Sequence, residues 1–316
     1  MTRTTIEVKR MKNRIVGVTV AVLGLIAALF MLSACDIEEV IENAASARVE
    51  STLIKTATFD VAGAPTFDVD SSNGSVRITG IEGQSNVQVT ATLSSRGETL
   101  EEADDRVGRI RIDMSQSGDR ITLHYIASEQ DADVRKYSGV AFTVTCPPAL
   151  AEALVDTSNG SISVRKIQGV LDVDTSNGSI TVEDFAGEIR GDTSNGSITV
   201  RQAEGVLRLD TSNGAIELTN VNVAVDADTS NGRIEFDGTL MGEHHRLSTS
   251  NGRIDFRTPA DASLRIEART SNATISTGLP LVGDTQGDSW DAELNPPTTT
   301  RVELRTSNGS IRIDGT

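Results

Sequence analysis

The residues best placed to do chemistry are aspartates that recur at a fixed spacing. Five of them stand three residues before an asparagine, 18 residues apart: Asp156, Asp174, Asp192, Asp210 and Asp228. If successive units stack, their carboxylates line up beside Ser and Asn oxygens, and calcium prefers such hard oxygen ligands. The alternative is a solvated face on which the aspartates point outward and pair with arginines. Because the nonapeptide of calcium-binding β-rolls is absent, these are weak calcium candidates, and the sequence indicates no other metal site.

The remaining reactive side chains form no catalytic pattern. The three histidines are His124, His244 and His245, and neighbours on a strand point to opposite faces, so the His pair is a poor metal clamp. No serine stands in a nucleophile elbow. Cys146 is expected to be a buried, inert thiol. The sequence therefore predicts no catalytic residue and no cofactor.

The N-terminal 34 residues have the layout of a lipoprotein signal peptide. The apolar run of residues 15–32 is preceded by Lys9, Arg10, Lys12 and Arg14. Leu32-Ser33-Ala34-Cys35 follows and resembles the lipobox of bacterial lipoproteins. The resemblance implies cleavage before Cys35 and palmitate-type acylation of Cys35, and two acyl chains anchor a protein stably. An uncleaved transmembrane helix is the alternative, because the run just reaches spanning length. Met1 and Met11 are both plausible starts.

Composition limits the remaining chain. The 316 residues carry a net charge of -16 and only 3% aromatic residues. Nucleic-acid binding needs a basic face or stacking aromatics, so this partner class is not expected. We expect an acidic tether over residues 35–57 and one β-strand-repeat domain over residues 58–316.

A repeat supplies the elements that must position these residues. Ser-Asn-Gly, once replaced by Ser-Asn-Ala, occurs nine times, and such a period marks an architecture whose units pack on their neighbours. The step is 18 residues from Asn159 to Asn231 and then becomes 20, 21 and 36. We expect the nine asparagines to form a structural turn ladder: Asn73, Asn159, Asn177, Asn195, Asn213, Asn231, Asn251, Asn272 and Asn308.

Each period reads as two short strands and two corners. In residues 169–186, apolar and polar residues alternate on both sides of Asn177-Gly178, which is a strand pattern. Asn-Gly readily supplies positive φ at a tight turn, and Gly169 marks the second corner. Three residues after each motif asparagine stands a β-branched aliphatic: Val76, Ile162, Ile180, Ile198, Ile216, Ile234, Ile254, Ile275 and Ile311.

These aliphatics predict ladders of like residues about 4.8 Å apart, the strand spacing of a sheet. The expected fold is all-β: a flattened β-solenoid, or parallel β-helix, with coils of about 18 residues and Asn-Gly corners. A chain of Asn-Gly hairpins would explain the local alternation equally well. The variable composition of the second corner favours the solenoid.

Two regions interrupt the period. Residues 80–145 read as an irregular β region with one short helix over Glu98–Val107, which widens or caps the first coils. Residues 278–300 replace one motif copy with a loop. The last copy lies close to Thr316, so an unpaired sheet edge could result there, covered by charged residues or by a second molecule.

Two runs share the order of strand, Pro-led turn, alternating strand and motif turn: VAFTVTCPPALAEALVDTSNGSISV (140–164) and IDFRTPADASLRIEARTSNATIS (254–276). They resemble the bacterial putative-adhesin family of β-strand-repeat envelope proteins, a domain of unknown function. The resemblance covers residues 58–316 and implies the fold. The family carries no agreed catalytic residues.

The leading hypothesis is a non-enzymatic, membrane-anchored lipoprotein of the bacterial cell envelope, facing the periplasm or the surface. It would act in adhesion, scaffolding or envelope-stress sensing toward an unknown protein or polysaccharide partner. One alternative is a calcium-stabilised, β-roll-like binding module. A β-helical polysaccharide-active enzyme is less favoured, because such sites need carboxylate pairs and commonly an aromatic platform. The sequence leaves the oligomeric state open.

Overall fold

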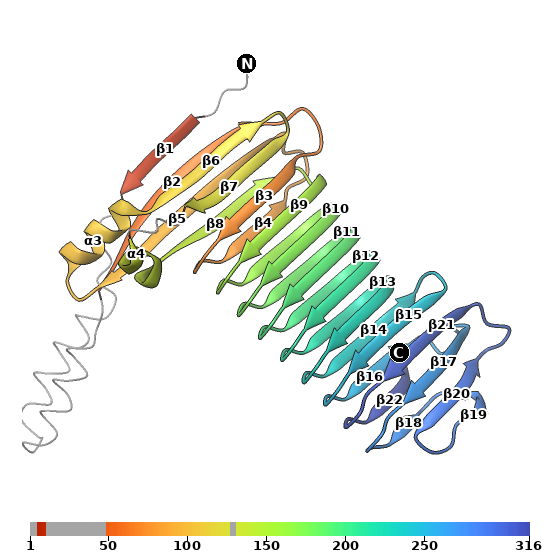
Figure 1. Ribbon diagram of the computed structural model, residues 1–316. Coiled ribbons are helices and arrows are strands. Elements are labelled where there is room, and N and C mark those ends of the chain that lie inside the picture. The colour runs from red at the N-terminus through yellow and green to blue at the C-terminus, as the bar shows by residue number, and fades with distance from the viewer. Residues whose placement is uncertain (1–4, 11–48, 127–130) are drawn as a thin grey trace, which may run out of the picture.

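The fold is an elongated stack of β-coils with a broad sheet at its N-terminal end, seen in the computed structural model of Figure 1. The structure describes residues 5–10, 49–126 and 131–316. The predicted lipidation residue Cys35 and the apolar run of residues 15–32 lie outside the described residues. Within the described part of the chain, no helix has the length and apolar character needed to cross a membrane.

Four long strands form the regular middle of the stack: β10 (Ile162–Thr175), β11 (Ile180–Thr193), β12 (Ile198–Thr211) and β13 (Ile216–Thr229). Each pairs in parallel and in register with the next, so that Ile162 lies opposite Ile180. The same offset of one repeat continues through β12 and β13. Parallel pairing between consecutive repeats confirms the predicted solenoid and excludes the chain of hairpins.

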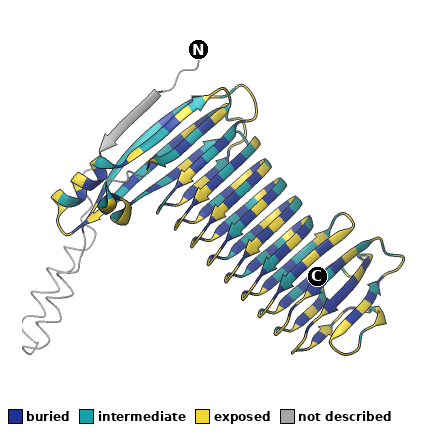
Figure 2. Ribbon diagram, in the orientation of Figure 1, coloured by how far each residue is buried: buried dark blue, intermediate teal, exposed yellow. Residues whose placement is uncertain are grey.

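The aliphatic ladders fill the inside of the stack. Buried and exposed residues alternate along both arms of each coil (Figure 2). Of the nine aliphatics three residues after a motif asparagine, eight are 0% exposed and Ile275 is 8% exposed. Burial of one such side chain stabilises a protein by about 1.5–3 kcal/mol. A parallel ladder stands five residues after each motif asparagine. In it Phe236 and Phe256 stack with ring centroids 5.1 Å apart.

The glycine of each motif is required by the close approach of two coils. A Cβ atom on Gly196 would lie 1.7 Å from the carbonyl oxygen of Gly178 in the preceding coil. At the glycine of every other Ser-Asn-Gly motif, an added Cβ would likewise lie 1.7–1.9 Å from a carbonyl oxygen of the neighbouring coil. In the described part of the chain, no residue of a Ser-Asn-Gly motif has a positive φ. Our expectation that Asn-Gly supplies a positive φ is therefore wrong, and steric exclusion of Cβ explains the glycine instead.

A threonine two residues before the motif asparagine ties neighbouring coils together. The Oγ1 of Thr193 donates to the carbonyl of Gly178 at 3.1 Å and accepts from the amide of Gly196 at 3.2 Å. The same pair of hydrogen bonds recurs at Thr175, Thr211 and Thr229. Each threonine thus satisfies buried backbone groups on both sides of the corner.

The asparagine side chains form a second ladder outside the threonines. The Nδ2 of one asparagine donates to the Oδ1 of the asparagine in the adjacent coil at 2.6–2.8 Å, at every step of the stack. Along the axis the order is Asn73, Asn159, Asn177, Asn195, Asn213, Asn231, Asn251, Asn308 and Asn272.

The buried threonine should matter more to stability than the exposed asparagine of the same motif. We expect Thr193→Val to lower the free energy of unfolding by about 1–3 kcal/mol, because it leaves buried backbone groups unpaired. We expect Asn195→Ala to cost less than about 1 kcal/mol, since water can replace its bonds. Urea denaturation of the two variants measures the difference. A larger loss for Asn195→Ala would contradict this ranking.

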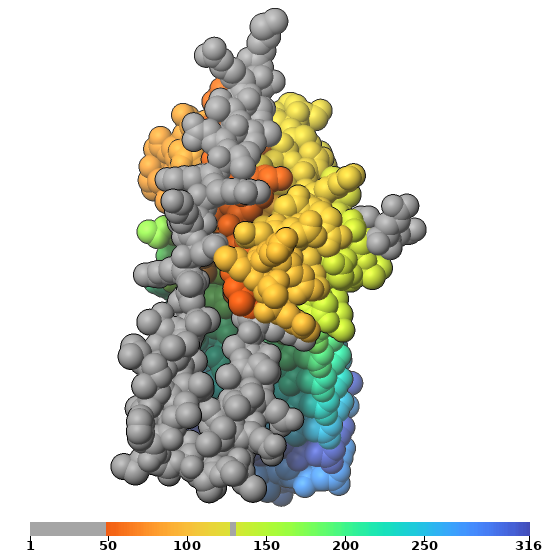
Figure 3. All heavy atoms as spheres, turned by 90° about the vertical axis from the view of Figure 1, so that its left-hand side faces the viewer, coloured from red at the N-terminus to blue at the C-terminus, as the bar shows by residue number. Residues whose placement is uncertain are grey.

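The N-terminal end is capped by the residues that interrupt the repeat. The first coil is β3 (Thr66–Ser71) and β4 (Val76–Gly80), and the chain rejoins the stack at β9 (Ala149–Thr157). Between them lie β5 (Asn86–Gly97), β6 (Arg111–Ser117), β7 (Arg120–Ile126) and β8 (Ser138–Cys146). Strand β7 pairs in parallel with β3, and β8 with β4, so both arms of the first coil are covered. Seen from this end, these residues lie in front of the coils (Figure 3).

Two strands at this end differ from the predicted boundaries. Strand β2 (Val49–Asp60) pairs antiparallel with β5, so residues 49–57 belong to the folded domain and the predicted tether over residues 35–57 is too long. The sequence of β2 did not predict a strand because most of its residues are polar, although Ala57 and Phe59 are buried. Strand β1 (Thr5–Arg10) pairs antiparallel with β2, inside the segment that the sequence assigns to a signal peptide. Removal of that segment stays a prediction.

Two helices accompany the cap, where the sequence predicted one. Helix α3 (Leu100–Arg109) begins two residues later than expected, because Thr99 caps it by accepting from the amide of Glu102. Helix α4 (Ala132–Tyr137) is the additional one. Arg109 binds Asp133 of α4 at 2.7 Å and lowers the pKa of that carboxyl to about 2.

At the C-terminal end the last repeat is stacked out of sequence order. The strands of these coils are β14 (Ile234–Leu240), β15 (His244–Thr249), β16 (Ile254–Thr258), β17 (Leu264–Arg269), β18 (Ile275–Thr277), β21 (Thr300–Arg305) and β22 (Ile311–Gly315). Strand β21 lies between β15 and β17. Strand β22 lies between β16 and β18. The repeat containing Asn308 therefore leaves no open edge, contrary to expectation.

The segment predicted as a loop forms the C-terminal cap. It contains β19 (Val282–Asp284) and β20 (Ser289–Leu294). Strand β20 runs antiparallel to β17, and β19 runs antiparallel to β20. Trp290 is buried at this end and donates from Nε1 to the carbonyl of Gly287 at 3.2 Å.

Candidate functional site

The bend between the two arms of each long strand opens a trough on the outside of the stack. At this bend one residue per coil adopts a left-handed backbone with φ of 54–56°: Lys166, Asp184, Gln202 and Asn220. Three of these coils then turn again at a glycine with φ of 130–137°: Gly169, Gly187 and Gly205. The first turn breaks the strand alternation. Gln202 and Glu204 would point inward if the alternation from Val200 continued, but both are exposed, on either side of the buried Ala203.

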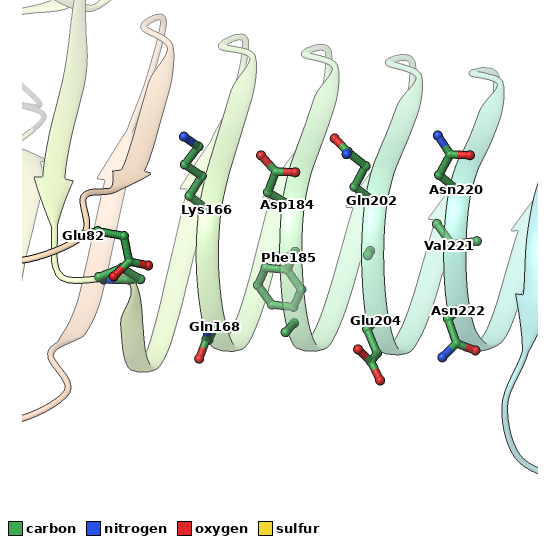
Figure 4. A pocket seen from close by; sticks show the side chains of 13 residues that line it. Glu82, Lys166, Gln168, Asp184, Phe185, Gln202, Glu204, Asn220, Val221 and Asn222 are labelled. Atoms are coloured by element: carbon green, nitrogen blue, oxygen red, sulfur yellow. The ribbon is translucent and has the colours of Figure 1, made fainter.

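The trough has two polar walls and an apolar floor. It encloses about 680 Å³ along four coils and ends at Glu82 and Pro148. The first wall is formed by Lys166, Asp184, Gln202 and Asn220, and the second by Gln168, Ala186, Glu204 and Asn222. Phe185, Ala203 and Val221 form the floor and are 3–4% exposed. Figure 4 shows the labelled wall side chains pointing to opposite sides of this floor.

The wall side chains have few partners within the protein. Seven of the eight wall residues are polar, the exception being Ala186, and all lie in the described part of the chain. Of these seven side chains only Asn222 makes a hydrogen bond, accepting from Thr239 Oγ1 at 2.8 Å. In the adjacent column, by contrast, Glu183 forms ion pairs with Arg165 and Arg201. The trough therefore keeps donors and acceptors that a ligand could satisfy.

The predicted calcium candidates lie on a different face, in one straight column. Pairing places Asp70, Asp156, Asp174, Asp192, Asp210 and Asp228 opposite one another in successive coils. The pKa values of Asp156, Asp174 and Asp210 are raised, first by partial burial and then by the neighbouring carboxylates. Farther along, the column continues with Ser248, Arg305 and Arg269.

Among the residues that the structure describes, no three His, Cys, Asp or Glu side chains gather in a way that could hold an ion. Two members of the column pair with arginines instead: Asp192 with Arg190 at 3.2 Å and Asp228 with Arg246 at 3.1 Å. These two ion pairs fit the solvated face considered above, and the calcium candidates stay a prediction.

Removing one charge from the middle of the column should stabilise the protein at neutral pH. Asp174 has carboxylates on both sides, and two unit charges one strand spacing apart in water repel by at most about 1 kcal/mol. Asp174 is only partly buried and most of its side chain is exposed, so salt screens it. We therefore expect Asp174→Asn to raise the free energy of unfolding by about 0.5 kcal/mol.

The pH dependence has a defined sign. The folded-state pKa of Asp174 is raised, so the stabilisation from protonating it is fully present below the unfolded pKa and is lost as pH rises through the folded pKa. The stability advantage of the Asn variant over the unaltered protein should therefore disappear in acid. The other titrating groups are the same in both proteins, so their contributions cancel in this difference. Urea titrations at neutral and acidic pH measure it. Asp226→Asn, which removes an ion pair with Arg246, is the control and should bring no gain.

The other reactive side chains stay apart. His244 is exposed and His245 is buried, on opposite faces of β15 as expected. The Nδ1 of His245 accepts from the amide of Val225 at 3.3 Å, and burial lowers the pKa of this histidine. His124 contacts Asp68 at 2.8 Å on the cap. Burial raises the pKa of the Cys146 thiol to about 12, which makes it unreactive at neutral pH.

The trough was not predicted, although the sequence carried a signal for it. Buried residues stand three, five and eight residues after the motif asparagine, as Ile180, Val182 and Phe185 do after Asn177. The step from five to eight breaks the period of two. A polar residue stands seven residues after the asparagine in four consecutive repeats, and that position is the left-handed residue of the first wall.

Solved structures of low sequence identity are similar to this chain. One is a putative adhesin from Bacteroides fragilis NCTC 9343, with 14% identity, a TM-score of 0.47 and coverage of 83% of this chain and 97% of that chain. A putative adhesin from Parabacteroides distasonis ATCC 8503 has 11% identity, a TM-score of 0.30 and coverage of 83% and 97%. A putative cell adhesion protein from Clostridium sporogenes ATCC 15579 has 8% identity, a TM-score of 0.24 and coverage of 85% and 100%. No curated protein matches the chain.

The family model described as Toastrack DUF4097 matches residues 65–314. Both runs that carried the predicted resemblance, residues 140–164 and 254–276, lie inside this match, and the resemblance is confirmed. Because the match extends from the first coil to the last, the protein belongs to the Toastrack DUF4097 family.

Proposed function

We propose that the protein is an exported, lipid-anchored component of the bacterial cell envelope that acts as a non-enzymatic binding module. The trough is the observation that carries this proposal, because its unpaired polar side chains repeat along coils whose backbones hold one another in place. Stacked repeats offer large partners an extended, rigid surface. Adhesion, scaffolding and envelope-stress sensing would all begin with such a binding step.

The anchor is proposed from the sequence Leu32-Ser33-Ala34-Cys35. Two acyl chains on Cys35 would hold the domain at the membrane. Processing there would leave 24 basic and 44 acidic residues, and this negative charge would keep the coils away from anionic headgroups. The anchor and the trough would thus have separate tasks.

Metabolic labelling with a palmitate analogue tests the anchor. We expect label on the full chain and none on Cys35→Ser. Cys146→Ser is the matched control and should keep its label, because the Cys146 thiol is buried. An unlabelled full chain, or label that persists in Cys35→Ser, would overturn the anchor.

Crosslinking in cells tests the binding function. We expect a macromolecular partner that is recovered with the full chain and lost with the wall variant Gln202→Ala/Glu204→Ala. Ser194→Ala, on the same coil but at the Asn-Gly corner, is the control. Recovery unchanged by the wall variant would argue against the trough, and turnover of a polysaccharide by the purified protein would overturn the non-enzymatic assignment.

A further inference from the structure

We propose that the trough binds an extended polysaccharide chain of amino or acetamido sugars, laid along the solenoid axis across β10 to β13. This inference rests on the proposed binding function and names its ligand class. The trough is long, open at the surface and shared by four coils, so its natural ligand is a polymer. Its volume of about 680 Å³ lies in the range of ligand-binding clefts.

The backbone of the trough is closed to an added strand. Successive coils pair with each other on both sides, so the arms beside the trough present no free sheet edge. A peptide could not extend the sheet here, which is the usual way in which an extended peptide binds a β-surface. We therefore expect side chains, and not strand addition, to recognise the ligand.

The wall chemistry fits a hydroxyl-rich chain. The walls offer amides at Gln168, Gln202 and Asn220, which both donate and accept, and carboxylates at Asp184 and Glu204, which accept. Sugar hydroxyls donate and accept in the same way. Wall residues recur once per coil, about 4.8 Å apart, and a sugar ring is of comparable length. Each ring would place its hydroxyls on both walls and its C–H face on the floor.

Charge selects among such chains. The trough is lined by three carboxylates, Glu82, Asp184 and Glu204, and by one ammonium, Lys166. An acidic polysaccharide would meet net repulsion, whereas amino and acetamido groups supply N–H donors to the carboxylates. Phe185 is 3% exposed and gives little stacking surface, so affinity must come from repeated polar contacts. The same chemistry would suit a free oligosaccharide or the glycan strands of a cell wall.

Titration of the full chain in detergent with chitohexaose, the hexamer of N-acetylglucosamine, tests the proposal. We expect binding with a Kd of about 1 mM or tighter by calorimetry. Gln202→Ala/Glu204→Ala should weaken it about fivefold or more, since at least two hydrogen bonds to the sugar are lost. Ser194→Ala should bind like the unaltered protein, and an alginate hexamer, an acidic oligosaccharide, should bind more weakly.

A second measurement keeps the test informative if the double variant is unstable. Chitohexaose should slow hydrogen exchange at residues 162–170 and 180–188 of the unaltered protein. No binding at about 10 mM hexamer, equal affinity for alginate, or protection confined to other faces would overturn the proposal. Isolated cell-wall sacculi, offered separately, show whether the glycan is recognised within an assembled wall.

The ligand class and the binding function can fail independently. If the hexamer does not bind while the crosslinked partner still depends on Gln202 and Glu204, the ligand class is wrong and the binding function stands. If the hexamer binds at the trough but no partner is recovered from cells, the site is supported and the cellular role is overturned.

Discussion

Replacing Gly196 with alanine is expected to destabilise the solenoid by about 3–5 kcal/mol, at the upper end of single substitutions. The added Cβ would lie 1.7 Å from the carbonyl oxygen of Gly178 and 2.4 Å from its carbonyl carbon. That oxygen cannot move away freely, because it accepts from Thr193. Separating the two coils instead would break the parallel pairing of β11 with β12 along its length.

A second glycine provides the matched control. Gly108 lies in helix α3, where a Cβ would meet no atom within 4 Å. Gly108→Ala should stabilise the protein by as much as about 1 kcal/mol, because glycine is a poor helix former. Urea denaturation of both variants gives the comparison. If Gly196→Ala proved as stable as the unaltered protein, the coils could change their spacing and the steric account of the motif would be wrong.

The coil could be predicted from the sequence because its determinants are local and repeated. Position by position, Ile180 and Val182 match Ile198 and Val200 one repeat later, and such ladders favour parallel pairing of like residues over hairpins. The nine aliphatics pointed inward, as the structure shows. The motif glycine was correctly placed at a corner but for the wrong reason, because a clash between coils is visible only once they are stacked.

The site was harder to predict, because it arises from a local departure from the pattern. The left-handed turn at Gln202 brings Gln202 and Glu204 to the outside, on opposite sides of the floor (Figure 4). No propensity favours glutamine in that conformation. The tether boundary was wrong for a related reason. A polar strand such as β2 buries few side chains, so its alternation is weak in the sequence although its backbone pairs fully with β5.

The order of the C-terminal coils could not be predicted at all. A spacing of 36 residues between Asn272 and Asn308 is compatible with a coil at the end of the stack or with one inserted between earlier coils. The choice is made by pairing between strands distant in sequence. Once β20 covers β17 from outside, the coil that contains Asn308 finds its partners between β15 and β17.

Deletion of residues 300–316 should therefore disrupt the stack internally. The deleted coil carries Val302, Leu304, Ile311 and Ile313, all 0% exposed, and its strands pair with coils on both sides. Its Asn308 also joins Asn251 to Asn272 in the asparagine ladder. Without it, β15 and β16 become open edges, and open edges promote association.

The loss should stay local, because each coil is stabilised mainly by its nearest neighbours. In the deletion variant we expect hydrogen exchange to accelerate strongly in β17 and β18 and to stay unchanged in β11 and β12. Leu304→Ala, expected to cost about 2–5 kcal/mol, should give the same pattern more mildly in a full-length chain. Val282→Ser, at an exposed position of the cap, is the control for substitution at this end. Retained protection of β17 in the deletion variant would mean that the coil of β17 and β18 can dock directly on β15 and β16, and the inserted coil would then be dispensable for the stack.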